Sequence, residues 1–138
     1  MGRNSGLGYS FEMSSLRLPR PMHYKLDRRR AVLCESLAEW AAWFAVADRR
    51  LAETWIDDVR ISTVFLGLDH SFLPGADPAL FETMVFADDT RHQMCRYFIW
   101  EEAEAGHAEM TALIRSEMEG AKVQAAEAWR QVYERLRA

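Results

Sequence analysis

The stretch FLGLDHSFLPGADPALFETMVF, from Phe65 to Phe86, decides how this chain folds. It joins two strongly apolar segments through a turn that contains Pro and Gly, and the connection is too short for the crossover helix that parallel strands require. The two segments are therefore predicted to be neighbouring antiparallel strands. Both carry groups that resist burial: Asp69 and His70 follow the first segment, and Glu82 lies inside the second. These groups form either a chemical site or the pairs that hold a hairpin together.

The flanking sequence extends this hairpin into an α+β domain. The segment VRISTVFLGL supplies the first strand, CRYFIW predicts a third, and HYKLD and AVLC predict two short strands nearer the amino end. The capping box SLAE predicts a helix that begins at Ser36 and whose apolar stripe runs to Trp55, so that it ends in the IDD segment. A second helix is predicted from Glu101, with Gly120 kinking or ending it before a helical tail. The expected fold is an antiparallel β-meander of three to five strands packed against two main helices, the last of them long or kinked.

Composition and charge divide the chain into two parts. Residues 1–21 mix Gly, Ser, Arg and Pro without an apolar period and are predicted to be a flexible basic leader, and residues 22–138 are predicted to form a single domain. Residues 1–30 carry seven basic and two acidic residues, whereas the remainder carries ten basic and nineteen acidic residues. An acidic body favours a basic partner over direct contact with nucleic acid, which is not expected.

The sequence also gives expectations for the location of the protein, the state of its thiols and its cofactors. No apolar run approaches the length of a membrane span, so we expect a protein of the cytoplasm, without a membrane partner. Cys34 and Cys95 are far apart and are predicted to be reduced thiols. No Gly-rich phosphate motif or metal-ligand spacing is present, and no cofactor or metal is expected.

The candidate chemical site comprises His70, Glu82 and His107. Strand alternation places Glu82 on the same face as three large apolar residues, so its carboxylate needs a partner: Arg96, Arg60, Ser62 or His107. If the three candidates converge, they suit a divalent metal or acid–base chemistry. The structural alternative is favoured, with His107 as a satisfied core residue and Glu82 in an ion pair. Gly106, just before His107, would let the helix approach the sheet closely.

Five aromatic and aliphatic residues are candidates for binding a partner. Trp43 falls outside the apolar stripe of the first helix, and an exposed Trp at this position would suit a protein contact. The tail helix has little core to share, so that its apolar side is expected to pack on a partner chain, which includes the possibility of a homodimer. The candidate binding residues are Trp43, Phe72, Leu73, Trp129 and Tyr133.

Three blocks of the sequence carry a resemblance to a known family. ISTVFLGLDHSF, LFETMVF and EEAEAGHAEM, in this order, are similar to a family of small bacteriophage and prophage proteins of unknown function. The resemblance spans residues 24–115, and Ile99-Trp100 stand where the family has a Ser or Thr cap, so the second helix is expected to be less well fixed at its start. The recurring blocks contain Gly67, Asp69, His70, Phe81, Glu82, Thr83, Met84, Gly106 and His107.

The resemblance implies a phage-derived protein acting in a bacterial host, and it brings no activity. The favoured function is a non-enzymatic factor that binds a host protein or protein–nucleic-acid complex, such as the defence complexes that anti-CRISPR proteins inhibit. Two alternatives remain at this stage. One is a small metal-binding or hydrolytic enzyme that uses His70, Glu82 and His107, and the other is a homo-oligomeric structural protein joined through the tail helix.

Overall fold

The computed structural model describes residues 22–71, 75–88 and 90–138, and it has the predicted α+β architecture. A hairpin of β1 (His23–Asp27) and β2 (Arg30–Cys34) precedes α1 (Leu37–Val46). The central element is an antiparallel sheet in the order β3-β4-β5-β6. A single long helix, α2 (Trp100–Arg137), follows the sheet. The strands of the sheet are β3 (Arg50–Ile56), β4 (Val59–Phe65), β5 (Phe81–Ala87) and β6 (Thr90–Tyr97). The predicted leader, residues 1–21, lies outside the described residues.

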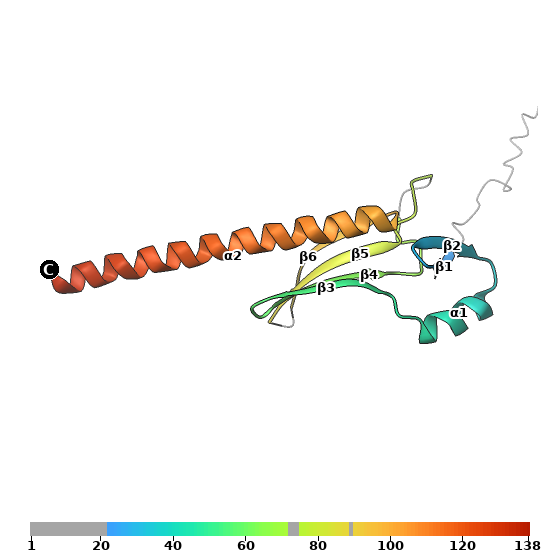
Figure 1. Cartoon of the computed structure of the whole chain (residues 1–138), viewed down its shortest axis with the longest axis horizontal. Helices are drawn as coiled ribbons and strands as arrows, with labels where there is room; N and C mark the ends of the chain where they lie inside the picture. The colour runs from blue at the N-terminus through green and yellow to red at the C-terminus, as the bar shows by residue number, and fades with distance from the viewer. Residues whose placement is uncertain (1–21, 72–74, 89) are drawn as a thin grey trace, which may run out of the picture.

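Helix α2 covers one face of the sheet and then continues past it. In Figure 1 the first half of α2 runs along β3–β6, and the second half projects beyond the sheet to the carboxyl end. The covered face is apolar: Ile61 and Val85 pack against Met110 and Ile114 of α2. A second cluster, Phe65, Leu80, Phe81 and Ala103, lies nearer the start of α2. Burial of these side chains stabilises the pairing of helix and sheet.

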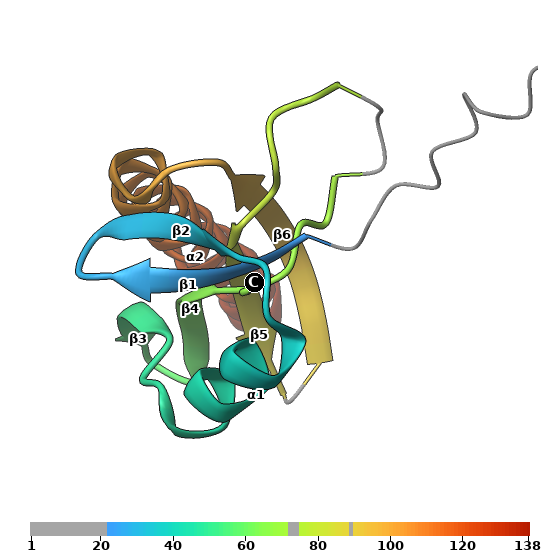
Figure 2. The ribbon, with the colours of Figure 1, turned by 90° about the vertical axis from the view of Figure 1, so that its right-hand side faces the viewer.

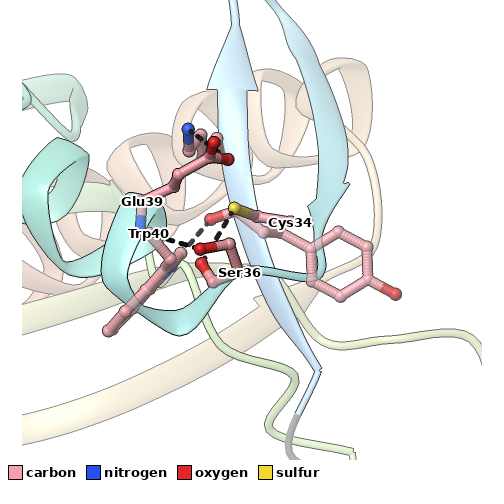
Figure 3. A network of polar contacts seen from close by, with 6 residues as sticks. Cys34, Ser36, Glu39 and Trp40 are labelled. Carbon is pink, nitrogen blue, oxygen red and sulfur yellow. Dashed lines mark hydrogen bonds and ion pairs between the residues drawn. The ribbon is translucent and has the colours of Figure 1, made fainter.

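The hairpin β1–β2 and helix α1 close one end of the sheet (Figures 1 and 2). Helix α1 begins as the capping box predicts, because the Ser36 hydroxyl accepts a hydrogen bond from the Glu39 amide (Figure 3). The Cys34 thiol contacts the Ser36 carbonyl in the same turn. The indole N–H of Trp40 lies 3.1 Å from the carbonyl oxygens of both Tyr24 and Gly67, which fixes α1 to β1 and to the segment after β4.

The structure corrects the predicted extent of the first helix. The helix ends at Val46, and the residues from Arg50 to Ile56, expected to be helical, form β3. The apolar residues Leu51 and Trp55 fit a helical period equally well, but this segment pairs with β4, with one register shift between Arg50 and Ala52. Asp48 accepts a hydrogen bond from the Arg50 amide and forms the turn between helix and strand. Tertiary pairing therefore overrides the local pattern.

Two further predicted boundaries change. Gly120 neither ends nor kinks the last helix, which runs unbroken to Arg137. The strand expected at CRYFIW is earlier, because β6 starts at Thr90 and α2 already begins at Trp100. Ile99 is the N-cap residue of this helix and makes no side-chain capping hydrogen bond.

Candidate functional site

A chain of buried polar side chains links α2 to the sheet. Thr63 and Thr83 face each other across β4 and β5, and their hydroxyl oxygens are 2.6 Å apart. The Nδ1 atom of His107 lies 2.7 Å from the Thr63 hydroxyl, and its Nε2 atom lies 2.8 Å from the Thr54 hydroxyl on β3. We call Thr54, Thr63, Thr83 and His107 the histidine network. It connects the helix to three strands through a single imidazole.

The donors and acceptors of the histidine network can all be hydrogen-bonded to one another. A neutral imidazole has one N–H donor and one acceptor nitrogen, and each hydroxyl can donate once and accept twice. Either tautomer therefore lets His107 bond to both threonines, while Thr63 also bonds to Thr83. Buried polar groups that are fully paired cost little, whereas leaving one unpaired is expensive. The network thus specifies where α2 docks on the sheet.

Most of the histidine network is buried, and only Thr54 is partly exposed. Thr63 and Thr83 are fully buried and His107 is 8% exposed. The described surface is hollowed elsewhere, in a groove of about 400 Å³ lined mainly by Val59, Val85, Ile114 and Met118. A general base must reach its substrate within hydrogen-bond distance. The burial of His107 therefore supports a structural role.

Burial also lowers the pKa of His107 below its ordinary value of 6.5. The unfolded chain then binds more protons than the folded chain as the pH falls through and below 6.5. The contribution of His107 to stability is accordingly complete above about pH 6.5 and is lost progressively at lower pH. We expect the free energy of unfolding, measured by urea titration between about pH 8 and pH 5, to fall towards the acid side. In a His107→Gln variant this part of the fall should disappear; an unchanged pH profile would contradict the assignment.

Gly106 allows α2 to lie close to β6, as the sequence predicts. A Cβ atom at this position would collide with the ring and hydroxyl of Tyr97. Tyr97 is itself held in place, since it is partly buried and packs against the cluster that contains Phe81 and Ala103. Burial raises the pKa of Tyr97, and the neighbouring Thr83 side chain offsets part of the rise. The close approach at Gly106 therefore positions His107 within reach of the threonines.

The predicted ion pair of Glu82 is confirmed. Arg96, its neighbour on β6, donates from Nε to Glu82 Oε2 at 3.0 Å. Because Thr83 faces α2, the adjacent Glu82 points to the opposite face of the sheet. His107 and Glu82 are thus separated by the sheet. Among the described residues, no group of three His, Cys, Asp or Glu side chains is arranged to hold a metal ion.

Asp69 and His70 belong to the loop that joins β4 and β5. The Asp69 carboxylate accepts hydrogen bonds from the amides of Ser71 and Ala79, at 2.8 and 3.0 Å, and so closes the base of this loop. The His70 amide donates to the Ala79 carbonyl. His70, Glu82 and His107 therefore do not converge, and the polar groups of the opening stretch hold the hairpin together.

The second face of the sheet carries a surface that the sequence analysis missed. Among the described helices, α1 packs on the hairpin and only α2 packs along the sheet, on its other face (Figure 1). On the uncovered face Trp55 and Met94 are 58% and 49% exposed, and Met84 and Phe86 are half-buried. Arg60 stacks on Phe86 with its guanidinium carbon 4.1 Å from the ring centroid. We call this surface the open face; its apolar members are Trp55, Met84, Phe86 and Met94, and Arg60, Glu82 and Arg96 lie among them.

The sequence predicted part of the open face, namely which residues of β5 lie on the same side. Alternation along LFETMVF correctly placed Glu82, Met84 and Phe86 together, but it did not show which face α2 would cover. Trp55 was assigned to a helix, so it could not be placed beside Arg60, its cross-strand partner.

The predicted binding residues differ in how exposed they are in the structure. Trp43, expected to be exposed, is half-buried and packs edge-to-face on Phe65, so that expectation was wrong. Phe72 and Leu73 lie outside the described residues. Trp129 and Tyr133 are 74% and 60% exposed on the projecting part of α2. Their role in binding stays a prediction.

The fold and these sites define an α+β domain with a structural histidine and exposed apolar surfaces on the sheet and on the last helix. Comparison of the chain with known proteins found no matching family model, no similar curated protein and no similar solved structure. In the part of the chain that the structure describes, none of the helices combines the length and the apolar character needed to cross a membrane.

Proposed function

We propose that this protein is a non-enzymatic protein-binding factor and that the open face is where its partner docks. The observation that supports this most strongly is the contrast between the two faces of the sheet. Thr63, Thr83 and His107 are buried between α2 and the sheet, while the open face presents Trp55 and Met94 largely exposed. Contiguous exposed apolar surface of this kind is typical of protein interaction sites, and Trp, Met and Arg are enriched in them.

The charges of the open face indicate the chemistry of the partner. Glu53 and Glu82 are neutralised by ion pairs with Arg50 and Arg96, whereas Arg60 lies over an aromatic ring. The surface therefore combines apolar side chains with an excess of arginine. The partner that fits it is a protein segment with apolar side chains flanked by carboxylates. The expected basic partner would instead meet the acidic outer side of α2, where Glu101, Glu102, Glu104 and Glu109 are exposed.

The resemblance to phage proteins gives this proposal its biological setting. A phage-derived binding factor acts on a component of its bacterial host, and we propose a host protein, in the narrower form a component of a defence complex, as its target. The narrower form rests on the resemblance alone.

The proposal is tested by capture from a bacterial host lysate with the tagged full-length chain, read by mass spectrometry. The decisive variant is Met94→Glu, which places a carboxylate on the open face. Its matched control is Leu113→Glu, because Leu113 is 45% exposed on α2 and Met94 is 49% exposed. We expect wild type and Leu113→Glu to capture the same protein and Met94→Glu to lose it. Capture that is equal for all three chains, or no capture by wild type, would overturn the proposal.

A further inference from the structure

The projecting part of α2, residues 119–137, has an apolar face that the chain itself leaves uncovered. All of these residues are exposed, among them Trp129 at 74% and Leu136 at 79%. Figure 1 shows the segment extending beyond the sheet to the carboxyl end. An isolated helix of this length is marginal in water, so a partner that covers this face would stabilise it.

The uncovered face continues the face that packs on the sheet. With about 3.6 residues per turn, the buried residues His107, Met110 and Ile114 are followed on the same side by Met118, Ala125 and Val132. This side therefore has the spacing of a helix that packs against a second element along its full length. The complete stripe beyond the sheet is Met118, Ala121, Ala125, Ala128, Trp129, Val132 and Leu136.

The stripe changes in size along the helix. Its first half is small, with Ala121, Ala125 and Ala128, and its second half is bulky, with Trp129, Val132 and Leu136. In a parallel pair of identical helices the bulky halves would meet each other and the alanines would face a gap. In an antiparallel pair each bulky half lies on the alanines of the other helix, which fills the space between them.

The charge of the helix also changes along its length, from acidic near the sheet to basic at the far end. Near the sheet lie Glu117 and Glu119, together with Asp57 and Asp58 in the exposed turn between β3 and β4. They outnumber the basic Arg115 and Lys122, of which Lys122 pairs with Asp57 at 3.4 Å. At the far end, Arg130, Arg135 and Arg137 outnumber Glu127 and Glu134.

By helical spacing, Glu117 and Arg135 share one flank of the stripe, and Glu119 and Arg137 share the other. An antiparallel pair brings equal flanks together and so places each basic end beside the acidic region of the other copy.

The groove gives the end of a second helix a place to sit. It opens where α2 leaves the sheet, and Val59, Val85, Ile114 and Met118 line it, with Glu117 and His92 among the polar lining residues. In an antiparallel pair centred near Ala126, residues Val132 to Leu136 of one chain arrive beside Met118 of the other. Apolar side chains would then enter the groove while the arginines meet its acidic surroundings.

We propose that a second copy of this chain covers the projecting part of α2, and that the two copies form an antiparallel, two-fold symmetric pair. The interface is self-complementary, as a two-fold dimer requires: small meets large and acidic meets basic twice over. This inference does not depend on the proposed function, because it uses α2 and the groove and leaves the open face free.

The first test is the mass of the full-length chain by sedimentation equilibrium over a range of concentrations. We expect a dimer for wild type. Val132→Asp should weaken self-association at least about a hundredfold, since each dimer would bury two charges. Val123 carries the control, Val123→Asp, because it lies on the opposite side of the same helix and is 67% exposed. A wild-type chain that is monomeric at every concentration, or equal weakening by both variants, would overturn the proposal.

The second test decides the orientation. Chains with Glu117→Lys and Glu119→Lys, or with Arg135→Glu and Arg137→Glu, should each dimerise more weakly than wild type because like charges meet. In a parallel pair these residues would already face their own kind in wild type, so neither change would weaken the dimer. Mixing the two variant chains should restore a stable heterodimer, which shows that the charges act across the interface. If neither variant dimerises more weakly than wild type, the antiparallel arrangement is wrong.

Discussion

Replacing His107 by alanine is expected to lower the free energy of unfolding by about 3 kcal/mol. The substitution removes the ring that bonds to Thr54 and Thr63, so it leaves their hydroxyls short of a partner and opens a cavity between α2 and the sheet. Thr63 is fully buried in the intact protein. The measurement is urea unfolding followed by circular dichroism at about pH 7.5.

The control for this prediction is His92→Ala, because His92 is an exposed residue of β6 whose imidazole makes only a long contact, 3.4 Å, with the Ala87 carbonyl. We expect its free energy of unfolding to stay within about 0.5 kcal/mol of wild type. If His107→Ala were as mild as His92→Ala, the histidine network would not be what positions α2.

The second large effect is expected for Gly106→Leu, which should also destabilise the protein by about 3 kcal/mol. Leucine is a good helix former, so the loss would come from the collision with Tyr97 and not from helix propensity. Tyr97 cannot move aside freely because it is partly buried and packs against the core cluster that contains Phe81 and Ala103. The helix would have to lift from β6, which would also draw His107 away from its threonines.

Gly120→Leu is the matched control for Gly106→Leu. It makes the same change in the same helix, but no atom lies within 4 Å of the position that a Cβ would take. Removing a glycine from an exposed helix interior should stabilise the protein by up to about 1 kcal/mol. The two variants are therefore expected to have opposite signs in thermal or urea unfolding, and a loss of stability in both would show that the effect is not specific to the contact with Tyr97.

The hairpin, the meander and the close approach at Gly106 could be predicted from the sequence because each rests on a local signal. Alternation in LFETMVF paired Glu82 with the correct side of its strand, and Arg96 was among its predicted partners. Gly106 stood out because glycine disfavours a helix interior, and on the packed face its missing side chain lets helix and sheet come close. The capping box at Ser36 identified the start of α1 through a similarly local pattern.

The remaining features depend on contacts that the sequence does not display. Residues Arg50 to Ile56 fit a helical stripe, and only their pairing with β4 makes them a strand. Once β3 was missed, Thr54 could not be proposed as a partner of His107. Trp43 lies outside the apolar stripe of α1, and only the way α1 packs on the rest of the domain brings it onto Phe65. The separation of His107 from Glu82 follows from which face α2 covers, and this is a tertiary choice.

The central claim is that this protein works through its surface and uses His107 for structure. The most direct test is the affinity of the captured host partner for two variants, measured by calorimetry. In Thr63→Val the histidine network loses its central hydroxyl, and in Met94→Glu the open face gains a carboxylate. Under conditions where both variants are folded, the account predicts near wild-type affinity for Thr63→Val and a loss of at least about tenfold for Met94→Glu. Loss of binding by Thr63→Val with Met94→Glu unaffected would contradict it.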